Sequence, residues 1–234
     1  MCIRDSKQAA DWLNTLGRPD QVMLVPGNHD IYAKGSADAV QATWQDYLFS
    51  GAQADSGAGS NQFPVLRKHG RLSFISLSSA CVTPVFMATG KLGRVQLEKL
   101  SRLLKQAADE GQLVCLLIHH PPLPGMTSWR KALVDAGALQ NVLKDHPPAV
   151  ILHGHLHHNR ELQWSDSRIY CTSAASSASD ASYRVFDIDE SDDSWNIQMT
   201  LKSIGMESGG EPEFVVVDQQ YWEIAKPAKT GTMV

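Results

Sequence analysis

The stretch V-P-G-N-H-D at residues 25–30 places an amide, an imidazole and a carboxylate side by side. It directly follows an apolar segment that we predict to be a strand over 21–25. We expect Pro26 to stiffen the loop and Gly27 to let the backbone turn sharply off the strand. Polar groups at the carboxyl end of a strand are typical of a ligand site in an α/β protein. The stretch therefore indicates an α/β fold with a functional loop at this point.

Two more apolar strands end in possible metal ligands. The predicted strand 113–118 leads into H-H at 119–120, and the strand 149–152 leads into H-G-H at 153–155. Groups at the carboxyl ends of such strands can converge even when they are far apart in the sequence. A lone histidine is more often structural than a ligand, but imidazoles and an amide oxygen at three strand ends together predict a site for a divalent metal such as zinc, iron or manganese.

The remaining pattern predicts helices and strands in alternation, followed by a region made mostly of strands. The predicted helices cover 7–16, 38–48, 93–108 and 131–143, and the other predicted strands cover 65–68, 72–77, 161–164, 168–172, 183–188 and 195–201. We expect a tight turn at 69–71, a surface loop over 51–60 and a solvated hairpin turn in the acidic stretch 187–193. This order predicts an α/β core in residues 1–205 whose sheet is extended or faced by an antiparallel set, and a surface tail over 206–234.

Composition excludes several classes of function. The chain has 234 residues, 43% of them apolar, and a net charge of −4 with no basic run, which disfavours binding to nucleic acid or to an anionic membrane. The apolar run 113–118 is too short to cross a bilayer, and the N-terminus lacks the pattern of a signal peptide. We therefore expect a cytoplasmic protein. The four cysteines are scattered without a C-x-x-C pair, so neither a disulfide framework nor a thiolate zinc site is indicated.

Three of these motifs resemble a known family when they are taken in order. G-N-H-D at 27–30, H-H-P-P at 119–122 and H-G-H-L-H at 153–157 are similar to the last three signature blocks of the calcineurin-like metallophosphoesterases. The segment 90–93 before a long amphipathic helix also resembles the middle of that family. The resemblance implies a four-layer α/β/β/α sandwich that hydrolyses phosphoesters with two divalent metal ions, such as Mn, Fe or Zn.

The resemblance also implies which residues bind the metals. Asn28, His119 and His153 would bind one metal ion, and His155 would bind the other. Between His119 and His120, the position in the motif favours His119. A dinuclear centre of this kind holds two cations about 3.5–4 Å apart, activates a water molecule and stabilises the attacking and leaving oxygens.

Two further residues have implied catalytic roles. His29 would be an uncoordinated imidazole near the substrate phosphate that stabilises the transition state or protonates the leaving oxygen. Asp30 would orient His29. The segment 122–131 could line the substrate pocket with Trp129, or Trp129 could instead pack in the core. A small phosphodiester is the preferred substrate, because the low net charge weakens the case for nucleic acid.

The start of the chain departs from the family pattern. The family opens with an Asp-x-His block and a Gly-Asp block, and neither exists before Asn28. The acids found there, Asp5, Asp11 and Asp20, follow neither an apolar strand nor a glycine. We therefore expect a fragment that lacks its first strands and part of the dinuclear centre. We also expect the 234-residue chain, as written, to aggregate or to be inactive.

Two alternatives remain open from the sequence. Metallo-β-lactamase-like hydrolases use H-x-H-x-D-H, but His157 stands where the aspartate should be and the cluster comes late in the chain. A non-catalytic, metal-binding remnant of the phosphoesterase fold is the other alternative. The missing ligands favour the remnant, whereas the retained His29 and Asp30 argue against it, because neither is needed merely to hold a metal.

Overall fold

A computed structural model describes residues 3–31, 35–51, 63–172, 181–205 and 213–226, with only the backbone described for residues 3–6. None of the helices in these ranges is long and apolar enough to span a membrane. The elements are α1 (Ile3–Leu16), the short 3-10 helix η1 (Asn28–Asp30), α2 (Ser36–Phe49), β1 (Val65–His69), β2 (Leu72–Ser76), α3 (Arg94–Asp109), β3 (Leu113–Ile118), α4 (Ala136–Asp145), β4 (Val150–His153), β5 (Arg160–Trp164), β6 (Ser167–Cys171), β7 (Ser182–Glu190), β8 (Ser194–Gly205) and β9 (Glu213–Ala225).

Among the described residues, six strands form one mixed sheet in the order β1-β2-β3-β4-β6-β5. The predicted hairpin around 69–71 is confirmed, since β1 pairs antiparallel with β2. Strands β2, β3 and β4 are parallel to one another. The register places Ile118 opposite His153, so β3 and β4 end at the same level. The histidines that follow these two strands therefore leave the sheet from one edge.

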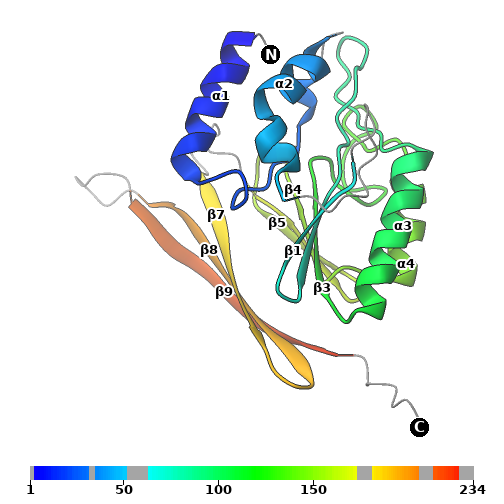
Figure 1. Cartoon of the computed structure of the whole chain (residues 1–234), viewed down its shortest axis with the longest axis vertical. Coiled ribbons are helices and arrows are strands. Elements are labelled where there is room, and N and C mark those ends of the chain that lie inside the picture. Colours follow the sequence, from blue (N-terminus) through cyan, green and yellow to red (C-terminus); the bar gives the residue numbers. More distant parts are fainter. Residues whose placement is uncertain (1–2, 32–34, 52–62, 173–180, 206–212, 227–234) are drawn as a thin grey trace. The chain divides into compact units, whose positions relative to one another are not determined.

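Helices α3 and α4 lie side by side (Figure 1) and share one apolar core with the sheet. Leu97, Leu100 and Leu104 form the buried stripe of α3 at helical spacing, as its sequence predicts. They belong to the same core cluster as Leu116 of β3 and Ile151 of β4, which are fully buried. The two strands that end in histidines are thus anchored by the largest apolar cluster in the described part of the chain.

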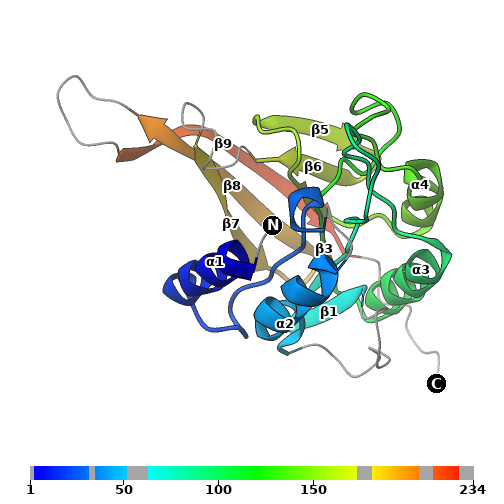
Figure 2. The same cartoon turned by 90° about the horizontal axis from the view of Figure 1, so that it is seen from above.

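Helices α1 and α2 also lie side by side (Figure 2) and have a cluster of their own. Leu13 of α1 packs with Val40, Trp44 and Leu48 of α2. The hydroxyl of Tyr47 extends this contact, because it lies 2.8 Å from Asn14 Oδ1 and 3.0 Å from the Gly17 carbonyl oxygen. The helices predicted over 7–16 and 38–48 are confirmed with slightly longer bounds.

Two predicted elements differ from the structure. No strand is assigned over 21–25 within the described residues, and the Val22 carbonyl accepts a hydrogen bond from the Arg67 guanidinium rather than from a neighbouring strand. The helix predicted to begin at 131 begins at Ala136. It starts later because the chain before it is held by a bridge between Gly90 and Leu133, and an apolar pattern cannot reveal such a bridge.

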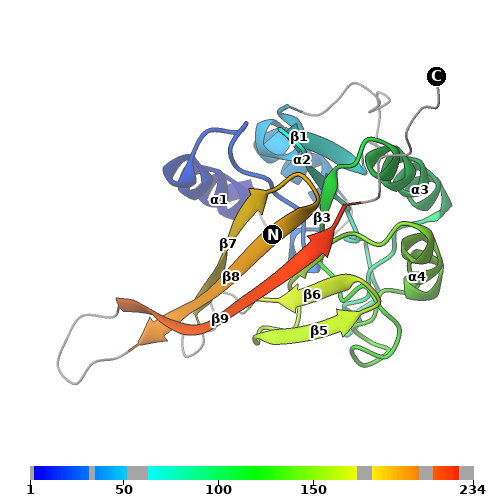
Figure 3. The ribbon, with the colours of Figure 1, turned by 90° about the horizontal axis from the view of Figure 1, so that it is seen from below.

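A second sheet is antiparallel and consists of β7, β8 and β9 in that order (Figure 3). The expected hairpin turn within 187–193 is confirmed between β7 and β8. Residues 213–225, which we expected in a surface tail, form β9 along the whole of β8. Valine and aromatic residues favour a strand there, although most of its side chains are exposed. The rest of the expected tail, at 206–212 and 227–234, and most of the expected loop 51–60 lie outside the described residues.

The chain divides into two compact units. One consists of Met1–His155 and Gln163–Ile169, and the other of Leu156–Leu162 and Tyr170–Val234. The first contains the turn at 27–30 and the histidines that follow β3 and β4. The fold class is therefore α/β as expected, with helices on a mixed sheet and a second, antiparallel sheet.

Candidate metal centre

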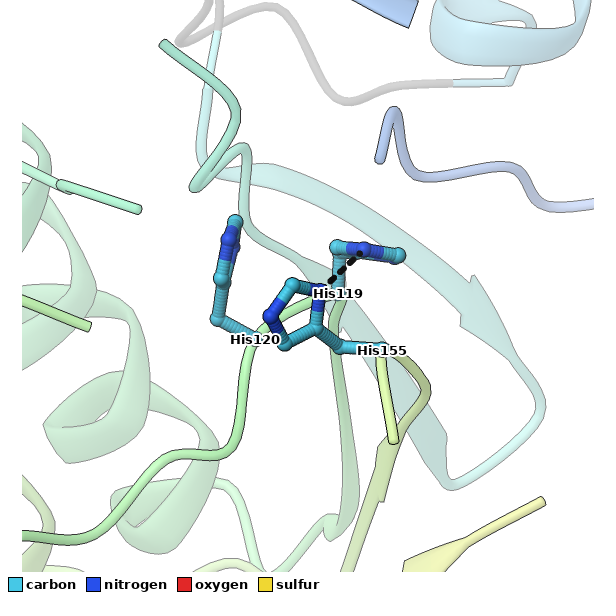
Figure 4. Close-up of side chains that lie close together, drawn as sticks. All are labelled: His119, His120 and His155. Carbon is cyan, nitrogen blue, oxygen red and sulfur yellow. Dashed lines mark hydrogen bonds between the residues drawn. The ribbon is translucent and has the colours of Figure 1, made fainter. Parts of the chain in front are cut away.

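Three segments that are distant in the sequence meet at the ends of β3 and β4. Asn28 Oδ1 lies 2.9 Å from His119 Nε2 and 3.1 Å from His155 Nδ1, and the two ring nitrogens are 3.2 Å apart. Figure 4 shows His119 and His155 side by side with His120 next to them. The Gly154 amide donates to the His119 carbonyl over 3.1 Å, so the two loops that carry the imidazoles are joined through their backbones.

The triangle of Asn28, His119 and His155 fits a divalent metal ion. Ligand atoms bound at about 2.1 Å stand roughly 3.0 Å apart at neighbouring octahedral positions and roughly 3.4 Å apart in a tetrahedron. The three observed separations, 2.9, 3.1 and 3.2 Å, fall in or near that range. One amide oxygen and two imidazole nitrogens are suitable donors for zinc, iron or manganese. The residues present could therefore hold one cation at this triangle.

His153 lies nearby with a different set of contacts. It is buried at the end of β4, and its Nδ1 lies 3.0 Å from the Gly154 carbonyl oxygen. A ring N–H that donates to a backbone carbonyl is common among metal-binding histidines, where it orients the other nitrogen. The structure groups His155 with Asn28 and His119. This grouping differs from the division of ligands between two metals that the family resemblance implies.

His120 is the third histidine of the cluster. Among the described residues, His119, His120 and His155 are grouped as potential metal ligands, because one nitrogen from each ring lies within 4.8 Å of the others. His120 is fully buried, whereas His119 is partly exposed. By distance alone, two overlapping sets of metal ligands are possible. Both contain His119 and His155, and the third ligand is either Asn28 or His120.

Burial keeps His119 and His120 neutral. Desolvation, followed by the charges of His120 and His155, lowers the pKa of His119 to about 3. Desolvation and then the charge of His155 lower the pKa of His120 to about 4. His29 and His153 also contribute to the lowered pKa of His119, so both lie near it. Neutral imidazoles at pH 7 have the lone pairs that a metal requires.

The turn at 27–30 is closed by its own aspartate. Asp30 Oδ2 accepts a hydrogen bond from the Gly27 amide at 2.8 Å, and the Asp30 amide donates back to the Gly27 carbonyl at 3.1 Å. Burial raises the pKa of Asp30, while the Gly27 hydrogen bond and the charge of His29 act in the opposite direction. The turn presents Asn28 inward, where it is buried, and His29 outward, where it is exposed.

Gly27 is needed for space rather than for the sharp turn that we expected. Its φ of −94° is available to any residue. A Cβ at this position would lie 2.8 Å from His119 Cε1 and 2.9 Å from His119 Nδ1. Only glycine therefore lets the turn come close enough for Asn28 to reach the His119 ring.

Several supporting residues were not anticipated from the sequence. Ser79 and Ala88 contact His120, and Arg67 holds the chain before the turn. No local pattern marks Ser79 or Ala88, since both lie in irregular backbone. Trp129 is 69% exposed, so the alternative that it packs in the core is wrong. Arg130 lies over its ring at 5.2 Å from the centroid.

Comparison with known proteins agrees with the motif pattern. The family model described as calcineurin-like phosphoesterase matches residues 4–159, which is more than half of the chain. The chain belongs to the calcineurin-like phosphoesterase family. The match contains the turn at 27–30 and all the histidines of the cluster. It also removes the metallo-β-lactamase-like alternative.

Relatives within the family include enzymes named for cyclic nucleotides. The chain is 40% identical over 86 residues to the 3',5'-cyclic adenosine monophosphate phosphodiesterase CpdA of Escherichia coli K12, covering 36% of this chain and 30% of the relative. It is 30% identical over 146 residues to a probable cyclic nucleotide phosphodiesterase of Vesicomyosocius okutanii, covering 61% of this chain and 52% of the relative. The matched part of the chain thus spans 30% of the length of the first relative and 52% of the length of the second.

Solved structures show weaker likeness. A putative 5'-nucleotidase from Staphylococcus aureus is 10% identical with a TM-score of 0.45, covering 92% of this chain and 40% of that one. A dimetal phosphatase from Danio rerio is 16% identical with a TM-score of 0.41, covering 56% of this chain and 38% of that one. Both TM-scores are below 0.5, so neither likeness adds to the assignment.

Proposed function

We propose that the protein is a metal-dependent phosphodiesterase that hydrolyses a small phosphodiester, with a 3',5'-cyclic nucleotide as the preferred substrate. The observation that carries the proposal is the triangle of Asn28, His119 and His155, whose edges of 2.9 to 3.2 Å suit a bound cation. Family membership and the names of the two relatives support the reaction class and the substrate. The net charge of −4 supports a small substrate over nucleic acid.

Each proposed residue has a separate task. Asn28, His119 and His155 would hold one cation, and His153, buried beside them, is the candidate ligand for a second in a dinuclear centre. Bound divalent ions would supply Lewis acidity and an activated water. His29 projects from the turn into solvent, where an N–H of its ring would donate to the leaving oxygen. Asp30 fixes the turn through Gly27 and would thereby orient His29.

A second candidate function follows from the composition of the cluster. Among the described residues, the group of converging potential ligands consists of three histidines without a carboxylate. One amide–imidazole triangle offers a single cation site, whereas the chemistry of a dinuclear centre requires two. We therefore expect the 234-residue chain to bind metal with little turnover. A non-catalytic, metal-binding role is the alternative that this observation favours.

The test measures metal binding, phosphate binding and turnover separately. The chain is stripped with EDTA and reloaded with Mn²⁺, and its metal content, its affinity for inorganic phosphate and its turnover of bis(p-nitrophenyl) phosphate and 3',5'-cyclic AMP are measured. His119→Gln should lose the metal. His29→Gln should keep the metal but bind phosphate about tenfold more weakly, because one hydrogen bond to the anion is lost.

The outcomes separate the two functions. Metal binding with a phosphate affinity that depends on His29 supports the phosphodiesterase, even when turnover is slow. Metal binding without affinity for phosphate and without turnover supports the non-catalytic role. Loss of metal in His29→Gln would contradict the task assigned to His29.

A further inference from the structure

His120 has a different environment from its neighbour His119. Its Nδ1 lies 2.7 Å from Ser79 Oγ, and its Nε2 lies 3.2 Å from the Ala88 carbonyl oxygen. Its backbone amide donates to the same Ser79 Oγ at 3.3 Å. His120 and Ser79 are both fully buried. Both ring nitrogens of His120 therefore have hydrogen-bond partners within the protein.

These contacts determine which nitrogen carries the proton. A backbone carbonyl only accepts hydrogen bonds, so Nε2 of His120 must carry a hydrogen and donate it to Ala88. A neutral imidazole then has a lone pair on Nδ1, which accepts the hydroxyl hydrogen of Ser79. Ser79 Oγ in turn accepts from the His120 amide. Every donor and acceptor of the group is matched in this one arrangement.

Close packing holds the His120 ring against the proposed ligands. A Cβ on Gly90 would lie 2.4 Å from His120 Nδ1, so the backbone at Gly90 lies directly against this ring. On the other side, the His120 ring centroid is 4.5 Å from that of His155 and 5.0 Å from that of His119. The closely packed His120 ring thus limits the positions that the His119 and His155 rings can take.

We propose that His120 is a positioning residue and not a metal ligand, and that its bonds to Ser79 and Ala88 set the spacing of the His119 and His155 rings. This inference rests on the proposed metal centre. Coordination through Nδ1 would displace the Ser79 hydroxyl, and coordination through Nε2 would leave the half-buried Ala88 carbonyl without its donor. Asn28 Oδ1 completes the triangle without either loss.

The first experiment observes the His120 ring directly. Long-range ¹H–¹⁵N correlation spectra of the full chain, labelled with ¹⁵N in the histidine rings, are recorded without metal and during a titration with Zn²⁺. His120→Gln identifies the His120 signals by their disappearance. We expect the Nε2–H tautomer at His120 throughout, while the ring nitrogens of His119 and His155 shift on binding Zn²⁺.

The second experiment measures Zn²⁺ affinity in variants. Ser79→Ala and His120→Gln should each weaken binding about tenfold, the range found for residues that orient ligands, and His119→Gln should weaken it at least about a hundredfold. The double variant Ser79→Ala/His120→Gln should bind no more weakly than His120→Gln, because both changes remove the same support. His69→Gln, an exposed histidine at the end of β1, is the matched control and should not change the affinity.

The results separate this inference from the proposed function. A metal-induced shift at His120 like that at His119, or an Nδ1–H tautomer in the metal-free chain, would overturn the positioning role and leave the metal centre intact. Absence of any histidine shift would overturn the metal centre and the positioning role together. If His120→Gln fails to fold, Ser79→Ala identifies the His120 signals instead, because it removes the hydroxyl group next to His120 Nδ1 and shifts that nitrogen.

Discussion

The candidate metal centre has two sides that are held in different ways. On the sheet side, His119 and His155 follow β3 and β4, which are paired in register and anchored in the apolar core. On the turn side, Asn28 follows a segment for which no strand is assigned among the described residues. The sheet side is supported by the pairing of β3 with β4 and by apolar side chains buried in the core. The turn side depends on individual side-chain hydrogen bonds.

The buried Arg67 is the main support that the structure shows for the turn side. Its Nη1 donates to the Pro19 carbonyl at 2.9 Å and to the Val22 carbonyl at 2.7 Å, and its Nη2 donates to the Tyr47 carbonyl. Arg67 lies on β1, so it ties the approach to the turn and the end of α2 to the edge of the sheet. A single guanidinium can thus replace part of what a strand ladder would supply.

Arg67→Met should have the largest effect on stability. It leaves three carbonyls without their donor, and we expect the free energy of unfolding to fall by about 3 kcal/mol. Urea denaturation followed by circular dichroism measures the change. Hydrogen exchange should show faster opening of residues 19–28 than of β3. A loss below about 1 kcal/mol would show that the turn side has other, stronger supports.

The sheet side should make the metal-free chain sensitive to acid. The folded-state pKa of His119, about 3, lies below the ordinary value of 6.5, so protonation favours the unfolded state. The contribution of neutral His119 to the free energy of unfolding is complete above pH 6.5 and is lost as the pH falls toward 3. One pKa unit corresponds to about 1.4 kcal/mol, and between pH 7 and pH 4 we expect a loss on the order of 3 kcal/mol from this residue.

The matched variant for the acid sensitivity is His119→Gln, whose side chain does not titrate. Its unfolding free energy, measured by denaturation at a series of pH values after EDTA treatment, should fall less steeply below pH 6.5. Carboxylates contribute equally to both chains, so the difference between the two curves isolates the histidine. Identical slopes would mean that His119 is not buried as a neutral ring.

Gly27→Ala tests the contact between the two sides. Its new methyl would lie 2.8 Å from His119 Cε1, so either the turn or the ring must move. We expect Mn²⁺ or Zn²⁺ affinity to fall about tenfold, or about 1.4 kcal/mol, as measured by calorimetry. Gly154→Ala is the control, since its Cβ would have His119 Nδ1 at an ordinary 3.7 Å. Equal losses in both variants would show that steric contact with the ring is not the cause.

Arg94→Met should have the smallest effect on the free energy of unfolding. It is the surface control with which the loss in Arg67→Met is compared. Arg94 forms an ion pair with Glu98 one turn along α3, and the two side chains are 82% and 50% exposed. Exposed pairs of this spacing contribute about 0.3 kcal/mol. Urea denaturation should therefore find a change near the error of the measurement. A loss as large as that in Arg67→Met would mean that the method does not distinguish buried support from surface charge.

Elements with strong local patterns were predicted well, and elements that depend on a partner were not. Helix α3 follows from its apolar spacing, and β3 follows from an apolar run that is buried in the core. The segment 21–25 has the composition of a strand, but a strand also needs a neighbour to receive its hydrogen bonds. Strand β9 shows the opposite case, because β8 supplies a partner along its whole length and a segment expected in the tail becomes part of a sheet.

Residue types and motif order were sufficient to locate the three segments that meet at the candidate metal centre and to place the chain in its family, since both depend on short stretches of sequence. The tertiary structure decided which atoms face one another. It placed Asn28 against His119, 91 positions away, and against His155, 127 positions away, and it enclosed His120 between Ser79 and Ala88. Such contacts depend on how distant backbones pack, down to the missing side chain of Gly27, and short-range periodicity carries no information about that packing.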